Sequence, residues 1–166
     1  MLCKNDYGLP LKKKEIVKYL GEDVLSHGGR LKHSIDFIVP KSTPIYAALG
    51  GKVVYVKQDS KIGAPLKKYW NEGNRIVIKH RNNEYSAYEH LKYKGSKVVV
   101  GQVVKKGQLI GHSGNTGFSY EPHLHFEVFN KPSIDESEGK TLRVNFHKEL
   151  WRELRHQNKE IIPKKR

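Results

Sequence analysis

The sequence predicts an all-β fold: one domain of antiparallel sheets, arranged as a sandwich or barrel and followed by a short C-terminal helix. Three observations lead to this class. Short runs rich in valine, isoleucine and tyrosine follow one another through the middle of the chain. Glycine or asparagine marks the turns between them, as is typical of all-β domains. The length of 166 residues is enough for one domain with a hydrophobic core and short for two.

The N-terminal part of the chain gives weak signals, and clear strand signals start at residue 35. Residues 1–26 carry only a weak apolar pattern, so we expect a short helix or an irregular lead-in there. The strands expected next are 35–39, 45–49 and 53–56. Gly50 and Gly51 predict a turn that joins the last two of these strands as a hairpin. Residues 57–73, rich in lysine, glycine and proline, predict a long exposed loop.

A second hairpin is expected at 75–80 and 84–88. Asn82 and Asn83 lie between its strands, and asparagine suits a turn that needs positive φ. Further short strands, set apart by glycines or a polar loop, are expected at 98–100, 103–104, 109–110, 123–129 and 141–146. Apolar residues at helical spacing then predict the C-terminal helix within 147–158.

The composition limits the partners and the metal ligands. Lysine and arginine total 31 against 17 aspartate and glutamate, which gives a formal net charge of +14. Such a surface favours polyanions, whether nucleic acid, anionic membrane or acidic polymers of a cell envelope. Cys3 is the only cysteine, so any metal must be held by histidine, aspartate or glutamate. The sequence shows no spanning apolar run and no signal-peptide pattern, so we expect either a cytoplasmic protein or an export signal upstream.

Two histidines one residue apart lie in the strand expected at 123–129, within EPHLHFEV. Because alternate residues of a strand share a face, His123 and His125 point the same way, about 6–7 Å apart. The strand therefore presents two imidazoles side by side. The alternative interpretation is the polar, solvent-facing edge of a half-buried strand.

Three further histidines and one aspartate combine with this pair as candidates for a metal site. His90 ends the strand-like run YSAYEHL, and His27 and His33 precede Asp36 in SHGGRLKHSIDF. A hydrolytic zinc site needs three protein ligands and one open position for water. Histidine and aspartate suit zinc, and a remaining histidine serves for proton transfer or oxyanion stabilisation. The other histidines are expected to be surface or satisfied core residues: His80, His112, His147 and His156.

Three separated segments carry a family resemblance: HGGRLKHSIDFIVPKSTPIYAALGGKVVYV, NRIVIKHRNNEYSAYEHL and VVVGQVVKKGQLIGHSGNTGFSYEPHLHFEV. In this order they resemble the lysostaphin-type zinc endopeptidases, which cut the peptide part of bacterial peptidoglycan. The resemblance covers about residues 24–130 and implies the lysostaphin-type peptidase fold for this core. We therefore expect a single domain, 1–166, with a lead-in at 1–23 and a C-terminal strand and helix extension at 131–166.

The resemblance also implies roles for single residues. Asp36 corresponds to the aspartate zinc ligand of the family, and His125 corresponds to its second histidine ligand. His90 and His123 correspond to the two catalytic histidines, which share the base and oxyanion-stabilising roles. The commonest family pattern places the first ligand four residues before the aspartate, where this chain has Lys32.

Two histidines flank Lys32 and are candidates for the first ligand. His33 is three residues before Asp36, and in an extended segment these two side chains point to opposite faces. His27 is nine residues before Asp36 and is followed by two glycines, which allow a loop to fold back toward the aspartate. His27 also resembles the first ligand of family members with a longer loop. We favour His27, with His33 as the alternative.

The combined prediction is a zinc endopeptidase that binds one Zn²⁺ through His27, Asp36 and His125. The expected substrate is the stem or cross-bridge peptide of peptidoglycan, with the protein in the cell envelope or secreted. Anionic wall polymers are a further expected partner, no specific nucleic acid is expected, and the chain is expected to be a monomer. Tyr88 and Tyr120 are candidate donors to a substrate carbonyl, with a packing role as the alternative.

Two other functions remain open from the sequence. A non-catalytic envelope protein on the same scaffold, which binds wall or regulates another hydrolase, is distinguished by the absence of bound zinc. A nucleic-acid-binding β-barrel needs aromatic side chains interleaved with lysine or arginine on one sheet face. Only Tyr85, Tyr88 and Tyr93 suggest such a face, and this function leaves the histidines unexplained.

Overall fold

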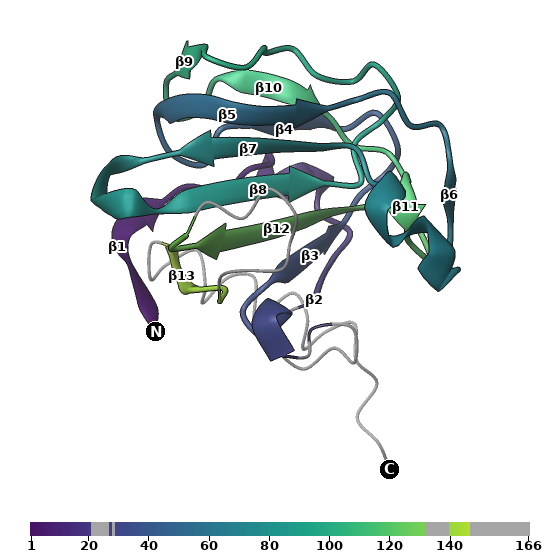
Figure 1. The fold of residues 1–166 in the computed structure, drawn as a ribbon, viewed down its shortest axis with the longest axis horizontal. Coiled ribbons are helices and arrows are strands. Elements are labelled where there is room, and N and C mark those ends of the chain that lie inside the picture. The colour runs from purple at the N-terminus through teal and green to yellow at the C-terminus, as the bar shows by residue number, and fades with distance from the viewer. Residues whose placement is uncertain (21–26, 28, 132–139, 147–166) are drawn as a thin grey trace.

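A seven-stranded antiparallel sheet organises the chain, with the strand order β2-β3-β12-β8-β7-β5-β9 (Figure 1). The computed structural model describes residues 1–20, 27, 29–131 and 140–146. The strands of this sheet are β2 (Lys18–Leu20), β3 (Ile35–Ile38), β5 (Gly51–Lys57), β7 (Arg75–Lys79), β8 (Tyr85–Glu89), β9 (Val103–Val104) and β12 (His123–Phe129).

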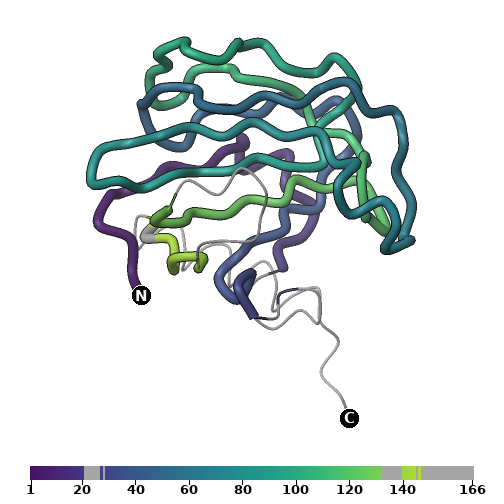
Figure 2. Tube along the Cα trace, in the orientation of Figure 1, coloured from purple at the N-terminus to yellow at the C-terminus, as the bar shows by residue number. Residues whose placement is uncertain are grey.

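Six shorter strands form three pairs around this sheet. They are β1 (Leu2–Tyr7) with β13 (Arg143–Phe146), β4 (Pro44–Tyr46) with β10 (Leu109–His112), and β6 (Gly63–Ala64) with β11 (Gly117–Phe118). The β1–β13 and β6–β11 pairs are parallel, whereas β4–β10 is antiparallel. Figure 2 shows the two ends of the described chain, β1 and β13, running side by side.

Helical structure in the described residues is limited to short 3₁₀ turns. These are η1 (Lys13–Glu15), η2 (Gly29–Leu31), η3 (Lys67–Glu72) and η4 (Arg81–Asn83). The all-β class predicted from the sequence is therefore confirmed, while the predicted C-terminal helix at 147–158 lies outside the described residues. Within the described ranges no helix is long and apolar enough to cross a membrane.

Strand β12 turns its apolar side chains into the core and its polar side chains to the opposite face of the sheet. Its residues Leu124, Phe126 and Val128 are fully buried in the main hydrophobic core, which also contains side chains of β1, β4, β10 and β13. The Phe126 ring lies 5.3 Å from the ring of Tyr88 and 6.1 Å from that of Phe146, measured between centroids. Because strand residues alternate between faces, this packing turns the intervening polar residues of β12 to the other side of the sheet.

The second predicted hairpin is confirmed. β7 and β8 pair antiparallel, with Ile76 opposite Tyr88, and the turn between them contains both predicted asparagines. Asn82 and Asn83 have φ values of 61° and 53°, in the left-handed region that asparagine tolerates. The predicted strands at 35–39 and 123–129 are also present, as β3 and β12.

Four local predictions are wrong. Residues 57–73, expected to be a long exposed loop, contain the strand β6 and the 3₁₀ turn η3. The hairpin expected at 45–56 does not form, because β4 pairs with β10 and β5 pairs with β7 and β9. The segment 98–100 is not a strand. Residues 1–26, expected to be a short helix or irregular, contain β1 and β2 in their described part. β1 buries Cys3, Asn5 and Tyr7 on one face, and its polar Asn5 hides the apolar alternation from a sequence reading.

Candidate metal centre and active site

The pairing of β12 with β3 and β8 brings the site residues together. His125 lies directly opposite Asp36 on β3 and opposite Glu89 on β8. His123 lies two pairs further along β3, opposite Ile38, and therefore on the same face. His90 follows the last residue of β8, so it lies beside β12 at the same end of the sheet. Register alone thus gathers residues that are up to 89 positions apart.

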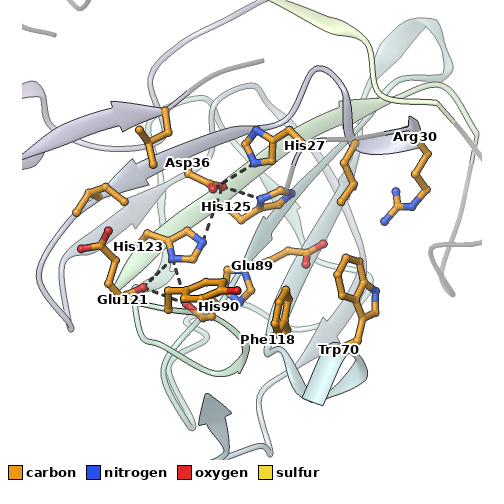
Figure 3. A pocket seen from close by; sticks show the side chains of 15 residues that line it. His27, Arg30, Asp36, Trp70, Glu89, His90, Phe118, Glu121, His123 and His125 are labelled. Atoms are coloured by element: carbon orange, nitrogen blue, oxygen red, sulfur yellow. Dashed lines mark hydrogen bonds and ion pairs between the residues drawn. The ribbon is translucent and has the colours of Figure 1, made fainter. Parts of the chain in front are cut away.

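Asp36 lies between two imidazoles (Figure 3). Its Oδ1 is 2.7 Å from His125 Nδ1, and its Oδ2 is 3.1 Å from His27 Nε2. The three residues offer ligand atoms that all lie within 4.8 Å of one another. All three side chains are buried. The structure therefore brings together the three residues that the sequence analysis favoured as a metal site.

His33 is placed elsewhere. Its backbone N–H donates a 2.9 Å hydrogen bond to Thr141 Oγ1, and its side chain belongs to neither group of described residues that can hold a metal. Thr141 also holds the 3₁₀ turn η2, because its hydroxyl and its backbone N–H both donate hydrogen bonds to the carbonyl of Arg30 in that turn. Of the two candidates left open by the sequence, the structure places His27, not His33, next to Asp36.

His90 and His123 form a second pair beside this cluster, with ring centroids 4.4 Å apart. His90 Nδ1 lies 2.7 Å from the carbonyl of Thr116, and His123 Nδ1 lies 2.8 Å from the carbonyl of Glu121. Because a carbonyl only accepts hydrogen bonds, each Nδ1 carries a proton and donates. In the neutral imidazole, Nε2 is then the nitrogen with a lone pair. His123 Nε2 lies 3.8 Å from Asp36 Oδ1, so it faces the cluster.

The electrostatics favour a charged Asp36. Burial alone raises the pKa of this carboxyl, but the positive charge and hydrogen bond of His125, with a hydrogen bond from His27, hold the pKa well below its usual range. For His125, burial lowers the pKa, and the Asp36 carboxylate reverses this and raises the pKa well above its usual range. The negatively charged Asp36 thus stabilises a positive charge next to it in the site.

In the second pair, His90 and His123, the surroundings favour the neutral form of the imidazole. Burial, together with the nearby charges of His123 and His125, lowers the pKa of His90 to about 3. Burial also lowers the pKa of His123, although Asp36 opposes this shift. Both imidazoles are therefore neutral near pH 7, which leaves Nε2 able to accept a proton.

A pocket of about 280 Å³ opens in front of these residues. One wall is aromatic: Trp70 stacks on Phe118 with centroids 5.7 Å apart, and Phe118 contacts Tyr120 edge to face at the same distance. The remaining lining residues include Leu20, Arg30, Leu31 and Ile38. The sequence analysis did not assign Trp70 or Phe118 to the site. The aromatic run before the H-x-H strand was the available signal for Phe118.

Other sequence-based candidates behave differently. Tyr120 lines the pocket and is 76% exposed, but Tyr88 is fully buried and hydrogen-bonded to Ala48 N and Ser86 Oγ. The suggested donor role of Tyr88 is therefore wrong, and the packing alternative holds. His80 is a satisfied core residue, bonded to the Gly50 carbonyl and to Ser86 Oγ, as expected. His112 is half-buried in β10, and His147 and His156 lie outside the described residues.

The chemistry of the cluster fits a zinc ion. His27, Asp36 and His125 supply two imidazoles and one carboxylate, a set that zinc accepts in hydrolytic sites with a fourth position open to solvent. The cluster lines the pocket, so a fourth position has access to substrate and water. A divalent cation held by these residues would replace the proton between Asp36 and His125, because histidine binds metals in its neutral form.

The histidine and aspartate cluster that lines the open pocket is a donor set typical of metal-dependent hydrolases, and the comparison with known families assigns the chain to the metallopeptidases. Within that class the chain belongs to peptidase family M23, whose family profile matches residues 30–145. This match confirms the family resemblance seen in the sequence. It also extends beyond residue 130 to include Thr141.

Similar proteins agree with this assignment. The chain is 40% identical over 95 residues to the peptidoglycan DD-endopeptidase ShyA of Vibrio cholerae, a match that covers 56% of this chain and 19% of ShyA. A zinc-containing peptidase from Vibrio cholerae superposes with a TM-score of 0.55 and 31% identity, covering 78% of this chain and 39% of that one. The catalytic domain of lysostaphin from Staphylococcus simulans gives a TM-score of 0.51 and 29% identity, covering 82% and 85%.

Proposed function

We propose that this chain is a zinc-dependent endopeptidase that hydrolyses a peptide bond in the stem or cross-bridge peptides of bacterial peptidoglycan, and that it acts in the cell envelope. The observation that carries the proposal is the position of Asp36 between His27 and His125, with His90 and His123 beside them at the floor of one pocket. The family assignment and the similarity to a peptidoglycan endopeptidase support this substrate class.

His27, Asp36 and His125 are the proposed ligands. When bound, zinc supplies a Lewis acid that polarises the scissile carbonyl and lowers the pKa of a water molecule toward 7. The buried Asp36 carboxylate balances the charge of the ion, and its contacts with both imidazoles hold them in position for binding.

His90 and His123 are the proposed acid–base pair. Backbone carbonyls accept hydrogen bonds from their Nδ1 atoms, so each ring is held in one orientation. In each ring Nε2 is then the nitrogen available for proton transfer. Because burial keeps both rings neutral, an Nε2 atom takes the proton of the attacking water. The resulting imidazolium stabilises the oxyanion and then returns the proton to the leaving amine.

The pocket walls hold the substrate. Trp70, Phe118 and Tyr120 offer apolar surface beside the histidine pair, where an extended peptide binds. The net charge of +14 attracts the anionic polymers of the wall and so concentrates the protein on its substrate.

The test is digestion of purified peptidoglycan by the zinc-loaded protein, measured as newly released amino groups. The expected results are activity in the wild type, loss of zinc and activity in His125→Ala, and loss of activity with zinc retained in His123→Ala. The exposed strand residue variant Lys79→Ala serves as a control that keeps both. Wild-type activity in the His123 and His125 variants refutes the assigned site, and a wild type that binds no zinc favours a non-catalytic wall protein instead.

A further inference from the structure

Glu127 is a buried carboxylate on the functional face of β12. It follows His123 and His125 at the strand period of two, so its side chain points the same way as theirs. Only 2% of Glu127 is exposed, although burying a carboxylate is costly unless charges or hydrogen-bond donors compensate. The groups that surround Glu127 therefore indicate what its charge does.

The first of these groups is the far nitrogen of His125. Glu127 Oε2 lies 3.8 Å from His125 Nε2, while Nδ1 of the same ring faces Asp36. A histidine that binds a metal through Nδ1 carries its proton on Nε2. At 3.8 Å the contact is longer than a hydrogen bond, so it acts electrostatically. A carboxylate at this place stabilises the proton on Nε2 and leaves Nδ1 free to bind the ion.

The other groups come from the segment between His27 and Asp36. Ser34 Oγ donates a 3.2 Å hydrogen bond to Glu127 Oε2, and Arg30 Nη1 lies 3.6 Å from Glu127 Oε1. Arg30 and Ser34 both belong to the stretch of chain that links two of the proposed ligands. Glu127 thus connects this stretch to the strand that carries the third ligand.

We propose that Glu127 is a positioning residue for the metal centre. Its carboxylate fixes the tautomer of His125 and, through Arg30 and Ser34, ties the segment that carries His27 and Asp36 to β12. This inference rests on the ligand set of the proposed function. It assigns Glu127 no contact with the substrate and no part in proton transfer to it.

A second buried carboxylate provides a matched control. Glu84, also 2% exposed, lies just before β8, at the end of that strand away from His90. It accepts hydrogen bonds from the backbone of Lys4 and from Asn5 and Tyr7, and so anchors β1. Replacing either carboxylate with glutamine removes one buried charge at nearly constant volume. Only Glu127, however, contacts the segment that carries the ligands.

The experiment measures zinc affinity by competition with a chromophoric chelator in the full chain. Glu127→Gln is expected to raise the zinc Kd by about 10–100-fold, the usual effect of removing a partner of a metal-binding histidine. Glu84→Gln is expected to lower the midpoint of urea unfolding and to leave the zinc Kd unchanged. Arg30→Gln, whose side chain is partly exposed, is expected to raise the zinc Kd several-fold, and it tests the same link if Glu127→Gln does not fold.

An unchanged zinc Kd in Glu127→Gln overturns the inference, as does an unchanged Kd in Arg30→Gln if the first variant does not fold. An equal rise in Glu84→Gln also overturns it, because the effect is then one of general stability. His125→Ala separates this failure from that of the proposed function. If His125→Ala loses zinc while Glu127→Gln keeps it, only the positioning role fails. If His125→Ala binds zinc as the wild type does, the ligand assignment fails and the inference fails with it.

Discussion

Replacing His90 with glycine and, in a second variant, with alanine measures the backbone strain at the proposed catalytic position. His90 has a φ of 58°, in the left-handed region, where a side chain with a Cβ costs about 1–2 kcal/mol. Glycine avoids this cost but loses about 0.5–1 kcal/mol through the larger entropy of its unfolded state. Both variants lose the hydrogen bond from Nδ1 to the Thr116 carbonyl, so its contribution cancels in the comparison.

We therefore expect the glycine variant to be more stable than the alanine variant by roughly 0.5–1 kcal/mol. Urea unfolding of the zinc-free proteins, followed by circular dichroism, measures this difference. The same pair of substitutions at Lys79, an exposed residue of β7, is expected to give the opposite order, because glycine weakens a strand. An alanine variant at position 90 as stable as the glycine variant refutes the reasoning. The strain matters for function because the left-handed turn after β8 sets the His90 ring beside that of His123.

Three further predictions follow from the structure. Zinc at 100 times its Kd adds about 2.7 kcal/mol, so chelation is expected to lower Tm by about 5–10 °C in calorimetry, and an unchanged Tm counts against a metal site in the folded state. Burial lowers the pKa of His80, so its contribution to stability is complete above the unfolded-state pKa of about 6.5 and is lost as pH falls below that value. His80→Gln is thus expected to reduce the slope of the unfolding free energy against pH below pH 6.5, by up to about 1.4 kcal/mol per pH unit. A slope equal to that of the wild type contradicts the lowered pKa of His80. In Gly63→Ala the new Cβ would lie 1.6 Å from the Asn115 carbonyl oxygen, so we expect β6 to separate from β11 and activity to fall about ten-fold or more with the circular dichroism spectrum kept; wild-type activity is the contrary result.

Local sequence signals predicted those parts of the fold that depend on local chemistry. The β7–β8 hairpin was predictable because its turn has two adjacent asparagines, and β12 because its apolar residues alternate with polar ones. The hairpin expected at 45–56 failed because its apolar runs suit any neighbouring strand. Pairing with the distant β10 and β7 satisfied them better than pairing with each other, and no local signal records that choice.

The site, too, is predictable from the sequence only where it depends on local structure. The shared face of His123 and His125 follows from the strand period, and the structure brings His27 and Asp36 to it. The choice between His27 and His33 depends on the path of the chain between residues 27 and 36, which spacing alone does not fix. The sequence analysis missed Glu127, although this residue continues the alternation of His123 and His125. A glutamate in a strand usually faces solvent, whereas Glu127 faces the buried imidazole of His125.

The central claim is tested most directly by a crystal structure of the zinc-loaded protein with anomalous diffraction data collected at the zinc edge. The account predicts one anomalous peak in the pocket, bonded to His27 Nε2, a carboxylate oxygen of Asp36 and His125 Nδ1, with His90 and His123 close to its open coordination position. A peak bonded to His33, or a zinc ion away from Asp36, contradicts it.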